Sequence, residues 1–362
     1  MRALFASSAT GGHIYPALAI ADEIKRRDPE AEILFVGAVW EIGKDIVRTA
    51  GYDQVHIDVS GFDRKSPAAV FKTLRKLLKA SADVKKIIRD FKPDICIGTG
   101  GHISGPVIRG AKKARIRTFI QEQNVIPGMA NKLSEKYADK VFVGFEETAK
   151  YFKNQSKVIV SGNPVRSVLS EAGGERKGFR EKYGVPEGAF CLFFFGGSQG
   201  AEAINAAAVD TAEHLSGYYY SILITGRDYF ADFYERYPVR SRAGLCLLEY
   251  SDSIYELYAA ADLIISRAGA LTVTEIALSG KASILIPSPN VTNNHQYYNA
   301  KALADRGAAL LMTEDGILDG RLAKEIVRLA ANQDELAKMS NAATDQAKPH
   351  SLKVIVDEIF GS

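Results

Sequence analysis

Residues 190–208 read FCLFFFGGSQGAEAINAAA, and this succession indicates the fold class of the protein. Phe190–Phe195 is an uninterrupted apolar run, typical of a strand that is buried on both faces of a parallel sheet. The glycine-rich loop Gly196–Gly200 follows, and Ile204 and Ala208 then fall on one face of a helix. A strand, a glycine loop and a helix in immediate succession predict an α/β unit.

The same succession recurs along the chain in two sets of strands. The first set is predicted at Met1–Ala6, Glu32–Gly37, Asp94–Gly98, Thr118–Ile120, Lys140–Val143 and Lys157–Val160. The second set is predicted at Phe190–Phe195, Ser221–Thr225, Leu245–Leu248, Leu263–Ser266, Ser283–Ile286 and Ala309–Met312. We therefore expect an α/β protein of two doubly wound, Rossmann-like parallel-sheet domains. Ligands of such sheets bind at the carboxyl ends of the strands, so we expect the main site in a cleft that both domains face.

The length of 362 residues also favours two domains. We place the boundary in the Gly-, Asn- and Pro-containing segment Gly162–Arg166. The predicted domains are an N-terminal domain (1–163) and a C-terminal domain (164–345). The last residues, 346–362, are expected to form a helix that returns to the N-terminal domain.

Composition limits the classes of function. Lys and Arg number 46 and Asp and Glu 43, and the net charge of +3 is too small to indicate a nucleic-acid-binding protein. The three cysteines, Cys96, Cys191 and Cys246, have no metal-ligand spacing, which favours a reducing compartment. No apolar run approaches the roughly 18 residues of a membrane span, and the first residues do not resemble a signal peptide.

Two loops of the second domain predict a nucleotide site. The first consists of Gly196, Gly197, Ser198, Gln199 and Gly200, and it matches neither the P-loop nor the G-x-G-x-x-G pattern. Its free amides at a helix N-terminus suit a phosphate, although a turn without a ligand has the same sequence. The second loop precedes a helix predicted from about Ala270, with Glu275 one turn inside. Glu275 can bind a ribose diol or simply complement the helix dipole, and a second anion loop in the same domain favours the ribose.

Two Gly-Gly-His loops follow strands of the first domain. They are Thr10-Gly11-Gly12-His13 and Gly98-Thr99-Gly100-Gly101-His102. An imidazole there can accept a proton from an alcohol near neutral pH, and it can equally well bond to the backbone of a helix end. A metal site would need a third ligand, and none is evident nearby, so we expect no metal.

Two polar segments suit sugar hydroxyls. Gln121–Asn124 follows an apolar strand, where a polar cluster can bind a polyol or form a polar turn. Asn293–Ala300 begins a predicted helix that places Gln296 and Asn299 on one face.

In this order the motifs resemble those of the GT-B glycosyltransferases, and most closely those of the MurG family. That family transfers N-acetylglucosamine from UDP-N-acetylglucosamine to lipid I, undecaprenyl-pyrophosphoryl-MurNAc-peptide, and so forms lipid II for peptidoglycan. The matching segments are 10–16, 93–106, 122–132, 162–166, 196–205, 266–275 and 293–300. The resemblance implies an inverting hexosyltransferase without cofactor or metal, and no Asp-x-Asp sequence occurs in the chain.

The resemblance also implies that residues 1–163 form the acceptor- and membrane-facing domain and residues 164–345 the donor-binding domain. It further implies residue roles. His13 matches a candidate catalytic base, and Glu122 is the second candidate. Gly100, Gly101 and His102 fall on the acceptor side. Residues implied in binding UDP-N-acetylglucosamine are Thr10, Gly11, Gly12, Asn124, Arg166, Ser198, Ser251, Ala270, Leu271, Thr272, Val273, Thr274, Glu275 and Gln296.

Departures from the family pattern lie in the N-terminal half. Ser8-Ala9 stands where the family has Gly-Gly, Glu41-Ile42-Gly43 where it has Gly-Leu-Glu, Gln121 where it has His, and His102 where it commonly has Tyr. The acceptor is therefore less firmly implied than the donor. Three alternatives stay open: a GT-B enzyme with another lipid acceptor, a UDP-N-acetylglucosamine 2-epimerase, and a nucleotide-sugar binder without activity.

The segment Pro67–Phe91 reads as a helix with one apolar and one basic side. A lipid-linked acceptor requires contact with the membrane, so we expect peripheral binding to its anionic inner surface, on the cytoplasmic face. The alternative is an ordinary helix that packs on the sheet and keeps its basic side in water. The two interpretations are compatible for one helix.

Overall fold

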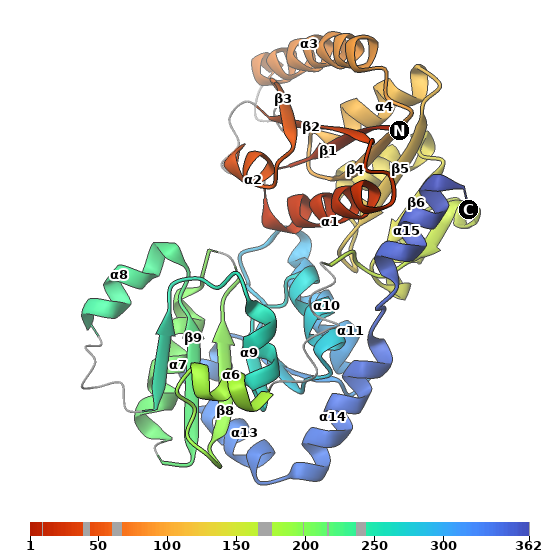
Figure 1. The fold of residues 1–362 in the computed structure, drawn as a ribbon. Coiled ribbons are helices and arrows are strands. Elements are labelled where there is room, and N and C mark those ends of the chain that lie inside the picture. Colours follow the sequence, from red (N-terminus) through yellow and green to blue (C-terminus); the bar gives the residue numbers. More distant parts are fainter. Residues whose placement is uncertain are drawn as a thin grey trace. The chain divides into compact units, whose positions relative to one another are not determined.

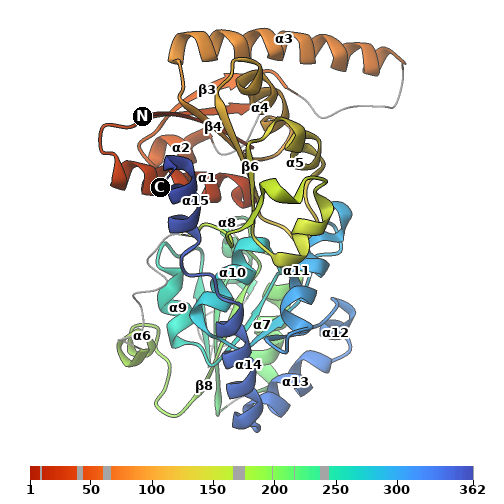
Figure 2. The same cartoon turned by 90° about the vertical axis from the view of Figure 1, so that its right-hand side faces the viewer.

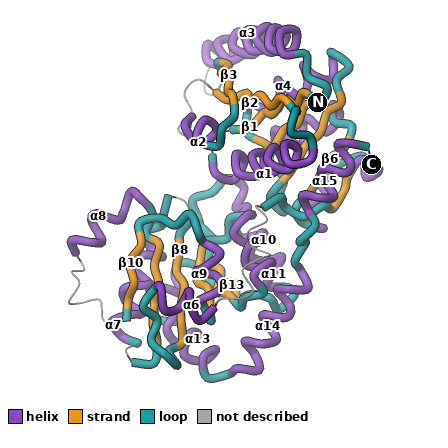
Figure 3. Tube along the Cα trace, in the orientation of Figure 1, coloured by secondary structure: helices purple, strands orange, loops and turns teal. Residues whose placement is uncertain are grey.

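The structure is a computed structural model that describes residues 1–8, 10–38, 44–59, 67–165, 176–197, 199–215, 217–236 and 244–361. The chain divides into two compact units (Figure 1). Unit 1 comprises Met1–Val165 and His350–Ser362, and unit 2 comprises Arg166–Pro349. Each unit has a parallel sheet of its own, visible as two groups of strands in Figure 3.

The sheet of unit 1 has seven strands in the order β3-β2-β1-β4-β5-β6-β7. The strands are β1 (Arg2–Ser7), β2 (Glu32–Ala38), β3 (Asp53–Ile57), β4 (Ile95–Gly100), β5 (Arg117–Glu122), β6 (Lys140–Val143) and β7 (Val158–Val160). The helices are α1 (Gly11–Arg27), α2 (Lys44–Thr49), α3 (Pro67–Phe91), α4 (Ser104–Lys113), α5 (Met129–Ser134) and α15 (Ser351–Phe360), with three short 3-10 turns, η1 (Glu135–Tyr137), η2 (Glu146–Tyr151) and η3 (Gln155–Lys157).

The sheet of unit 2 has six strands in the order β10-β9-β8-β11-β12-β13. The strands are β8 (Phe190–Phe195), β9 (Tyr219–Ile224), β10 (Leu245–Leu248), β11 (Leu263–Ser266), β12 (Ser283–Leu285) and β13 (Ala309–Leu311). The helices are α6 (Arg176–Lys182), α7 (Glu202–His214), α8 (Arg227–Arg236), α9 (Ile254–Ala260), α10 (Ala270–Ser279), α11 (His295–Ala304), α12 (Asp315–Leu318), α13 (Arg321–Ala330) and α14 (Gln333–Gln346), and η7 (Thr292–Asn294) precedes α11.

The predicted α/β class with two parallel sheets is confirmed. All six residues of β8 are buried, as its continuous apolar sequence predicts. The strand β3 is missing from the prediction, because it lies at the sheet edge and is only partly buried, so its sequence lacks a continuous apolar run.

In each sheet the order of strands reverses at one point. In unit 1 this point lies between β1 and β4: β2 and β3 follow on the side of β1, and β5, β6 and β7 on the side of β4. In unit 2 it lies between β8 and β11. At such a point the loops that follow the two strands lie side by side without a helix crossing between them. The candidate loops after Ser7, Gly100, Phe195 and Ser266 are the four loops at these positions.

The helix α3 keeps the predicted bounds Pro67–Phe91, and Figure 2 shows it running along one side of unit 1. In the part whose side chains are described, Val84 is buried and packs on Gly110 of α4. Lys79, Lys85, Lys86 and Arg89 are exposed. Within the described ranges, no helix combines the length and the hydropathy that a membrane span requires.

The helix α15 completes the core of unit 1. Ile355, Val356 and Ile359 are fully buried with apolar residues of α1 and β1. An ion pair of 2.5 Å joins Arg27 of α1 to Asp357 of α15.

We expect Ile355→Ala to lower the free energy of unfolding by about 2–5 kcal/mol, because it leaves a cavity between α15 and α1. Val354→Ala is the matched control, since Val354 is 38% exposed on the same helix, and its cost should stay within about 0.5 kcal/mol. Urea unfolding of the full chain measures both. Equal destabilisation by the two variants would contradict this packing.

Candidate functional site

His13 is held by the first turn of α1. The backbone carbonyl of Thr10 accepts hydrogen bonds from the amides of His13 (2.9 Å) and Ile14 (3.0 Å). The hydroxyl of Thr10 lies 2.7 Å from Nδ1 of the His13 ring. The half-buried imidazole is therefore fixed at the start of the helix by both the backbone and the side chain of one residue.

The loop after β4 lies directly against the loop after β1, as expected. Gly100 has a φ of +120°, and a Cβ at this position would collide with the imidazole of His13. At Gly101 a Cβ would collide with the side chain of Ser8. The structure thus brings Thr10, Gly11, Gly12, His13, Gly100 and Gly101 together, with His102 half-buried beside them. Ala9, like Glu41-Ile42-Gly43, lies outside the described residues.

Glu122 is buried at the end of β5 and is saturated with hydrogen bonds. Its Oε1 accepts from the amide (3.0 Å) and the side chain (3.3 Å) of Asn124, and its Oε2 accepts from the amide of Gly128 (3.0 Å) and the side chain of Asn131 (2.8 Å). Burial raises the pKa of Glu122, and the four hydrogen bonds oppose that shift. This geometry favours a carboxylate that shapes the loop 123–131 over one that takes a proton from a substrate.

The neighbouring amides form a buried network rather than an open polyol site. Gln121 donates to the side chain of Asn163 (3.0 Å), and Gln123 donates to the carbonyl of Thr99 (2.7 Å). Ser351 at the start of α15 donates to the carbonyl of Asn163 (2.8 Å). Of the segment Gln121–Asn124, only Asn124 is partly exposed. The polar-turn alternative therefore describes Gln121 and Gln123, and Asn124 is the member that a ligand can reach.

In unit 2 the glycine loop after β8 is packed against the end of β9. Gly200 has a φ of +84°, and a Cβ there would collide with the carbonyl of Thr225. Its amide donates to the carbonyl of Gly197 (3.0 Å), which closes the turn before α7 begins at Glu202. Gly196 and Gly197 are partly exposed and Gln199 is exposed. Ser198 and Arg166 lie outside the described residues.

The helix α10 begins at Ala270, as predicted, after the extended residue Gly269. The amides of Ala270, Leu271 and Thr272 precede the first bond of the helix, which runs from the amide of Val273 to the carbonyl of Gly269 (2.9 Å). The side chain of Val273 is buried, and the hydroxyl of Thr274 donates to the carbonyl of Ala270 (2.9 Å). The first turn of α10 therefore offers backbone amides rather than side chains to an anion.

Glu275 lies further along α10, where its carboxylate meets a buried tyrosine. The hydroxyl of Tyr258, on α9, donates to Oε2 of Glu275 over 2.9 Å. Burial raises the pKa of Glu275 to about 7, although the bond from Tyr258 acts in the opposite direction.

The segment before α11 is fixed from two sides. Oε1 of Gln296 accepts from the amide of Ser288 (2.9 Å), which leaves its amide nitrogen as the group that can donate to a ligand. Arg267, in the loop after β11, donates to the carbonyls of Ile286 (3.2 Å) and Pro287 (3.3 Å) and forms an ion pair with Glu314.

Two further expectations concern Asn299 and Ser251. The sequence predicts that Asn299 shares the ligand-facing side of α11 with Gln296, but it is fully buried and donates to the carbonyl of Ala268 (3.2 Å). It therefore anchors the loop before α10. Ser251 is half-buried after β10, and its hydroxyl accepts from the amide of Ser253 (3.2 Å).

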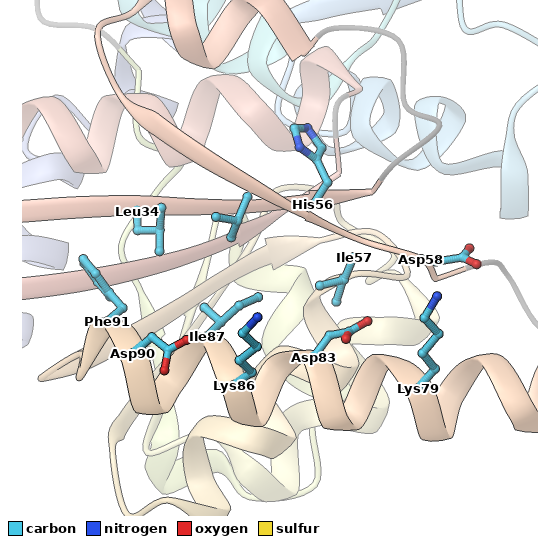
Figure 4. A pocket seen from close by; sticks show the side chains of 11 residues that line it. Leu34, His56, Ile57, Asp58, Lys79, Asp83, Lys86, Ile87, Asp90 and Phe91 are labelled. Atoms are coloured by element: carbon cyan, nitrogen blue, oxygen red, sulfur yellow. The ribbon is translucent and has the colours of Figure 1, made fainter.

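A separate groove lies between β3 and the second half of α3 (Figure 4). Its apolar lining includes Leu34, Ile57, Ile87 and Phe91. Lys79 and Lys86 alternate with Asp83 and Asp90 along its α3 side, so this side carries no net charge. None of the predicted site residues lines this groove.

The sequence does not predict the supporting roles of Tyr258 and Asn163, nor the contacts of Arg267 with Ile286, Pro287 and Glu314. Arg267 belongs to a recognised motif but has no predicted role, and Asn163 is predicted only as part of a domain boundary. Tyr258 has no signal in the sequence, because an aromatic residue on a helix resembles an ordinary core residue. Among the residues that the structure describes, no group of three His, Cys, Asp or Glu side chains is placed to hold a metal ion.

Comparison with known proteins gives consistent matches over both units. Residues 4–143 match the glycosyltransferase family 28 N-terminal domain, and residues 191–357 match the glycosyltransferase family 28 C-terminal domain. A relative from Finegoldia magna is 36% identical, with 99% of this chain and 98% of that protein aligned. It is named UDP-N-acetylglucosamine–N-acetylmuramyl-(pentapeptide) pyrophosphoryl-undecaprenol N-acetylglucosamine transferase.

Comparison with solved structures agrees with these sequence matches. The crystal structure of Acinetobacter baumannii MurG matches with a TM-score of 0.78 and 26% identity, covering 100% of this chain and 99% of that one. A UDP-GlcNAc 2-epimerase from Neisseria meningitidis, bound to UDP-GlcNAc, has a TM-score of 0.69 but only 14% identity over the full length of both chains. At that identity the likeness concerns the fold alone.

We expect Gly100→Ala to displace the imidazole of His13, because the new methyl group occupies the position of the ring. Gly51→Ala is the matched control: Gly51 also has a positive φ (+84°), but a Cβ there would meet no described atom within 4 Å. Both variants carry a backbone cost of about 1 kcal/mol, so only Gly100→Ala should also shift the His13 ring signals in NMR spectra. An unchanged His13 spectrum in Gly100→Ala would contradict the contact.

Proposed function

The chain belongs to glycosyltransferase family 28, and on that basis we propose that it transfers N-acetylglucosamine from UDP-N-acetylglucosamine to the 4-hydroxyl of N-acetylmuramic acid in lipid I. The reaction inverts the anomeric carbon and yields lipid II and UDP. The observation that carries this proposal is the 36% identity to a named transferase over 99% of the chain. The likeness to 2-epimerases is confined to the fold, so the epimerase alternative is not favoured.

Unit 2 supplies the donor site. The departing UDP gains negative charge, which the N-terminal ends of α7 and α10 stabilise through backbone amides and helix dipoles. Glu275 accepts hydrogen bonds from the ribose hydroxyls. Gln296, whose Oε1 is taken by Ser288, donates its amide N–H to a hydroxyl of the sugar. Arg166, Ser198, Ser251 and Asn124 complete the donor contacts that the family pattern implies.

Unit 1 supplies the base. His13 accepts the proton of the acceptor hydroxyl through Nε2, which requires that Nδ1 carries a hydrogen and donates to Thr10. Thr10 thereby selects the productive tautomer, and Gly100, which has no side chain, leaves room for the ring.

Glu122 has a different part in this mechanism. All four of its hydrogen bonds come from residues 124–131, so it holds the loop that carries Asn124 and leaves proton transfer to His13. An apolar replacement would leave the backbone amides of Asn124 and Gly128 without their acceptor.

The membrane surface is reached through α3. In the described part of this helix the apolar side is buried against unit 1 and the basic side is exposed, an arrangement that leaves the basic side available to a membrane surface. Lys85 and Lys86 attract anionic lipid headgroups, each contributing about 1 kcal/mol near such a surface. The enzyme accordingly acts at the cytoplasmic face of the membrane, where its lipid-linked acceptor lies.

The direct test is UDP release from UDP-N-acetylglucosamine, with and without a soluble lipid I analogue. We expect release only with the analogue, and mass spectrometry should find N-acetylglucosamine attached to it. Release without an acceptor would favour hydrolysis or epimerisation. Donor binding without release would favour another acceptor or a non-catalytic binder, and either result would overturn the proposal.

We expect His13→Ala to lower kcat by about 10²–10⁴-fold with little change in the donor KM, because a general base acts in the transition state. His214→Ala, at an exposed histidine of α7, is the control and should leave both constants unchanged. Steady-state kinetics with the acceptor analogue measures both. Wild-type turnover in His13→Ala would remove His13 from the mechanism.

We expect Lys85→Glu combined with Lys86→Glu to weaken sedimentation with vesicles that contain anionic phospholipid by about tenfold or more, since two attractive charges become repulsive. The control is Lys324→Glu combined with Lys338→Glu, an equal charge change at exposed positions of unit 2. Binding should also fall as salt rises. If both pairs reduce binding alike, only net charge matters and α3 is not the contact surface.

A further inference from the structure

Tyr258 contacts the carboxylate of Glu275, the proposed ribose-binding group. Its hydroxyl donates to Oε2 of Glu275 over 2.9 Å, and its ring is only 1% exposed. The ring meets Phe193 and Phe195 of β8 edge to face, with centroids 5.8 and 5.9 Å apart. A hydroxyl on a ring held this way has little freedom to move, so it sets the orientation of the carboxylate that it touches.

Few other groups act on Glu275. The helix α10 packs against α9, α11 and α14. From α9 the titratable group that meets Glu275 is Tyr258. From α11 the uncharged Asn299 reaches the loop before α10, and from α14 the uncharged Thr344 lies next to Gly280 at its far end. Lys281, just beyond α10, donates to the carbonyls of Ala259 and Ala261.

We propose that Tyr258 is a positioning residue for donor binding: its hydroxyl orients the carboxylate of Glu275 toward the ribose hydroxyls. This inference rests on the proposed donor site of unit 2. The hydrogen bond from Tyr258 occupies one lone pair of Oε2, and the remaining lone pairs of the carboxylate accept from the diol. Tyr258 does not touch the substrate, and it acts only through Glu275.

The proposal has a signature in pH. Hydrogen bonds from ribose hydroxyls are stronger to a charged carboxylate than to a neutral carboxyl group. The ribose contact is therefore complete above the pKa of Glu275, which lies at about 7, and is lost as the pH falls through it. Removing the Tyr258 hydroxyl removes a hydrogen bond to the ionised form, so the pKa rises and the loss of binding begins at higher pH.

The experiment compares the binding of UDP and 2′-deoxyUDP to the full chain by calorimetry at pH values from about 6 to about 9, which span the pKa of Glu275 at about 7. The dissociation constant of 2′-deoxyUDP divided by that of UDP reports the 2′-hydroxyl contact. Ionisation of the phosphates affects both ligands alike and cancels in this ratio. In the wild type the ratio should rise with pH around this pKa. Tyr258→Phe keeps the ring and its packing, and in this variant the rise of the ratio should occur about one pH unit higher. Below the midpoint of the rise the ratio should be roughly tenfold lower than in the wild type, and by about pH 9 it should recover.

Two further variants make the outcome decisive. Tyr255→Phe is the same substitution on the same helix, at a ring that packs on Phe179, and it should behave as the wild type. Glu275→Gln should give a low ratio that does not change with pH. If Glu275→Gln has this effect but Tyr258→Phe follows the wild-type curve, the positioning role is refuted.

A ratio in Tyr258→Phe that is lower than in the wild type and does not recover at high pH would also refute the proposal, because it would indicate a packing defect alone. If neither Tyr258→Phe nor Glu275→Gln changes the ratio, Glu275 does not bind the ribose, and the positioning role of Tyr258 is refuted as well. Transfer to the lipid I analogue is measured separately, so loss of the proposed function and loss of this inference give different results.

Discussion

The parallel pairing of β1 with β4 and of β8 with β11 is the constraint on which the candidate site depends. Each pair marks the point where the strand order of its sheet reverses, so the loops after the two strands lie next to each other. His13 meets Gly100 for this reason, although the strands β2, β3 and β4 and the helices α2 and α3 begin between them along the chain. In unit 2 the same arrangement sets the glycine loop after Phe195 beside the start of α10.

The two units then hold their site residues by different means. In unit 1 a buried carboxylate, Glu122, organises a loop by accepting four hydrogen bonds, and side-chain amides extend this network to Asn163. In unit 2 the groups presented to an anion are backbone amides, and the side chains near them orient one another, as Tyr258 does Glu275. The contacts that hold the candidate site residues therefore lie in a polar interior in unit 1 and at the ends of helices in unit 2.

Most of the fold could be predicted from the sequence because continuous apolar strands identify parallel sheets, and only the half-buried edge strand β3 was missed. Glycine loops after strands also predicted which strand ends carry the candidate site residues. The roles of polar residues were harder to predict. Glu122, Gln123 and Asn299 look like ligand-binding residues in a linear pattern, and only three-dimensional contacts reveal that their polar atoms bond to the protein itself. The ligand-binding and catalytic roles of the site residues stay predictions, and Ser198 and Arg166 lie outside the described residues.

The helix α15 connects the order of synthesis to the order of folding. Its apolar residues Ile355, Val356 and Ile359 belong to the core of unit 1, yet the ribosome makes them after all of unit 2. At about 5–20 residues per second, translation of the intervening segment takes roughly 10–40 s. Until α15 has been made, the apolar residues of α1 that it covers lack this partner on the nascent chain, and transiently exposed apolar surface of this kind is prone to aggregation.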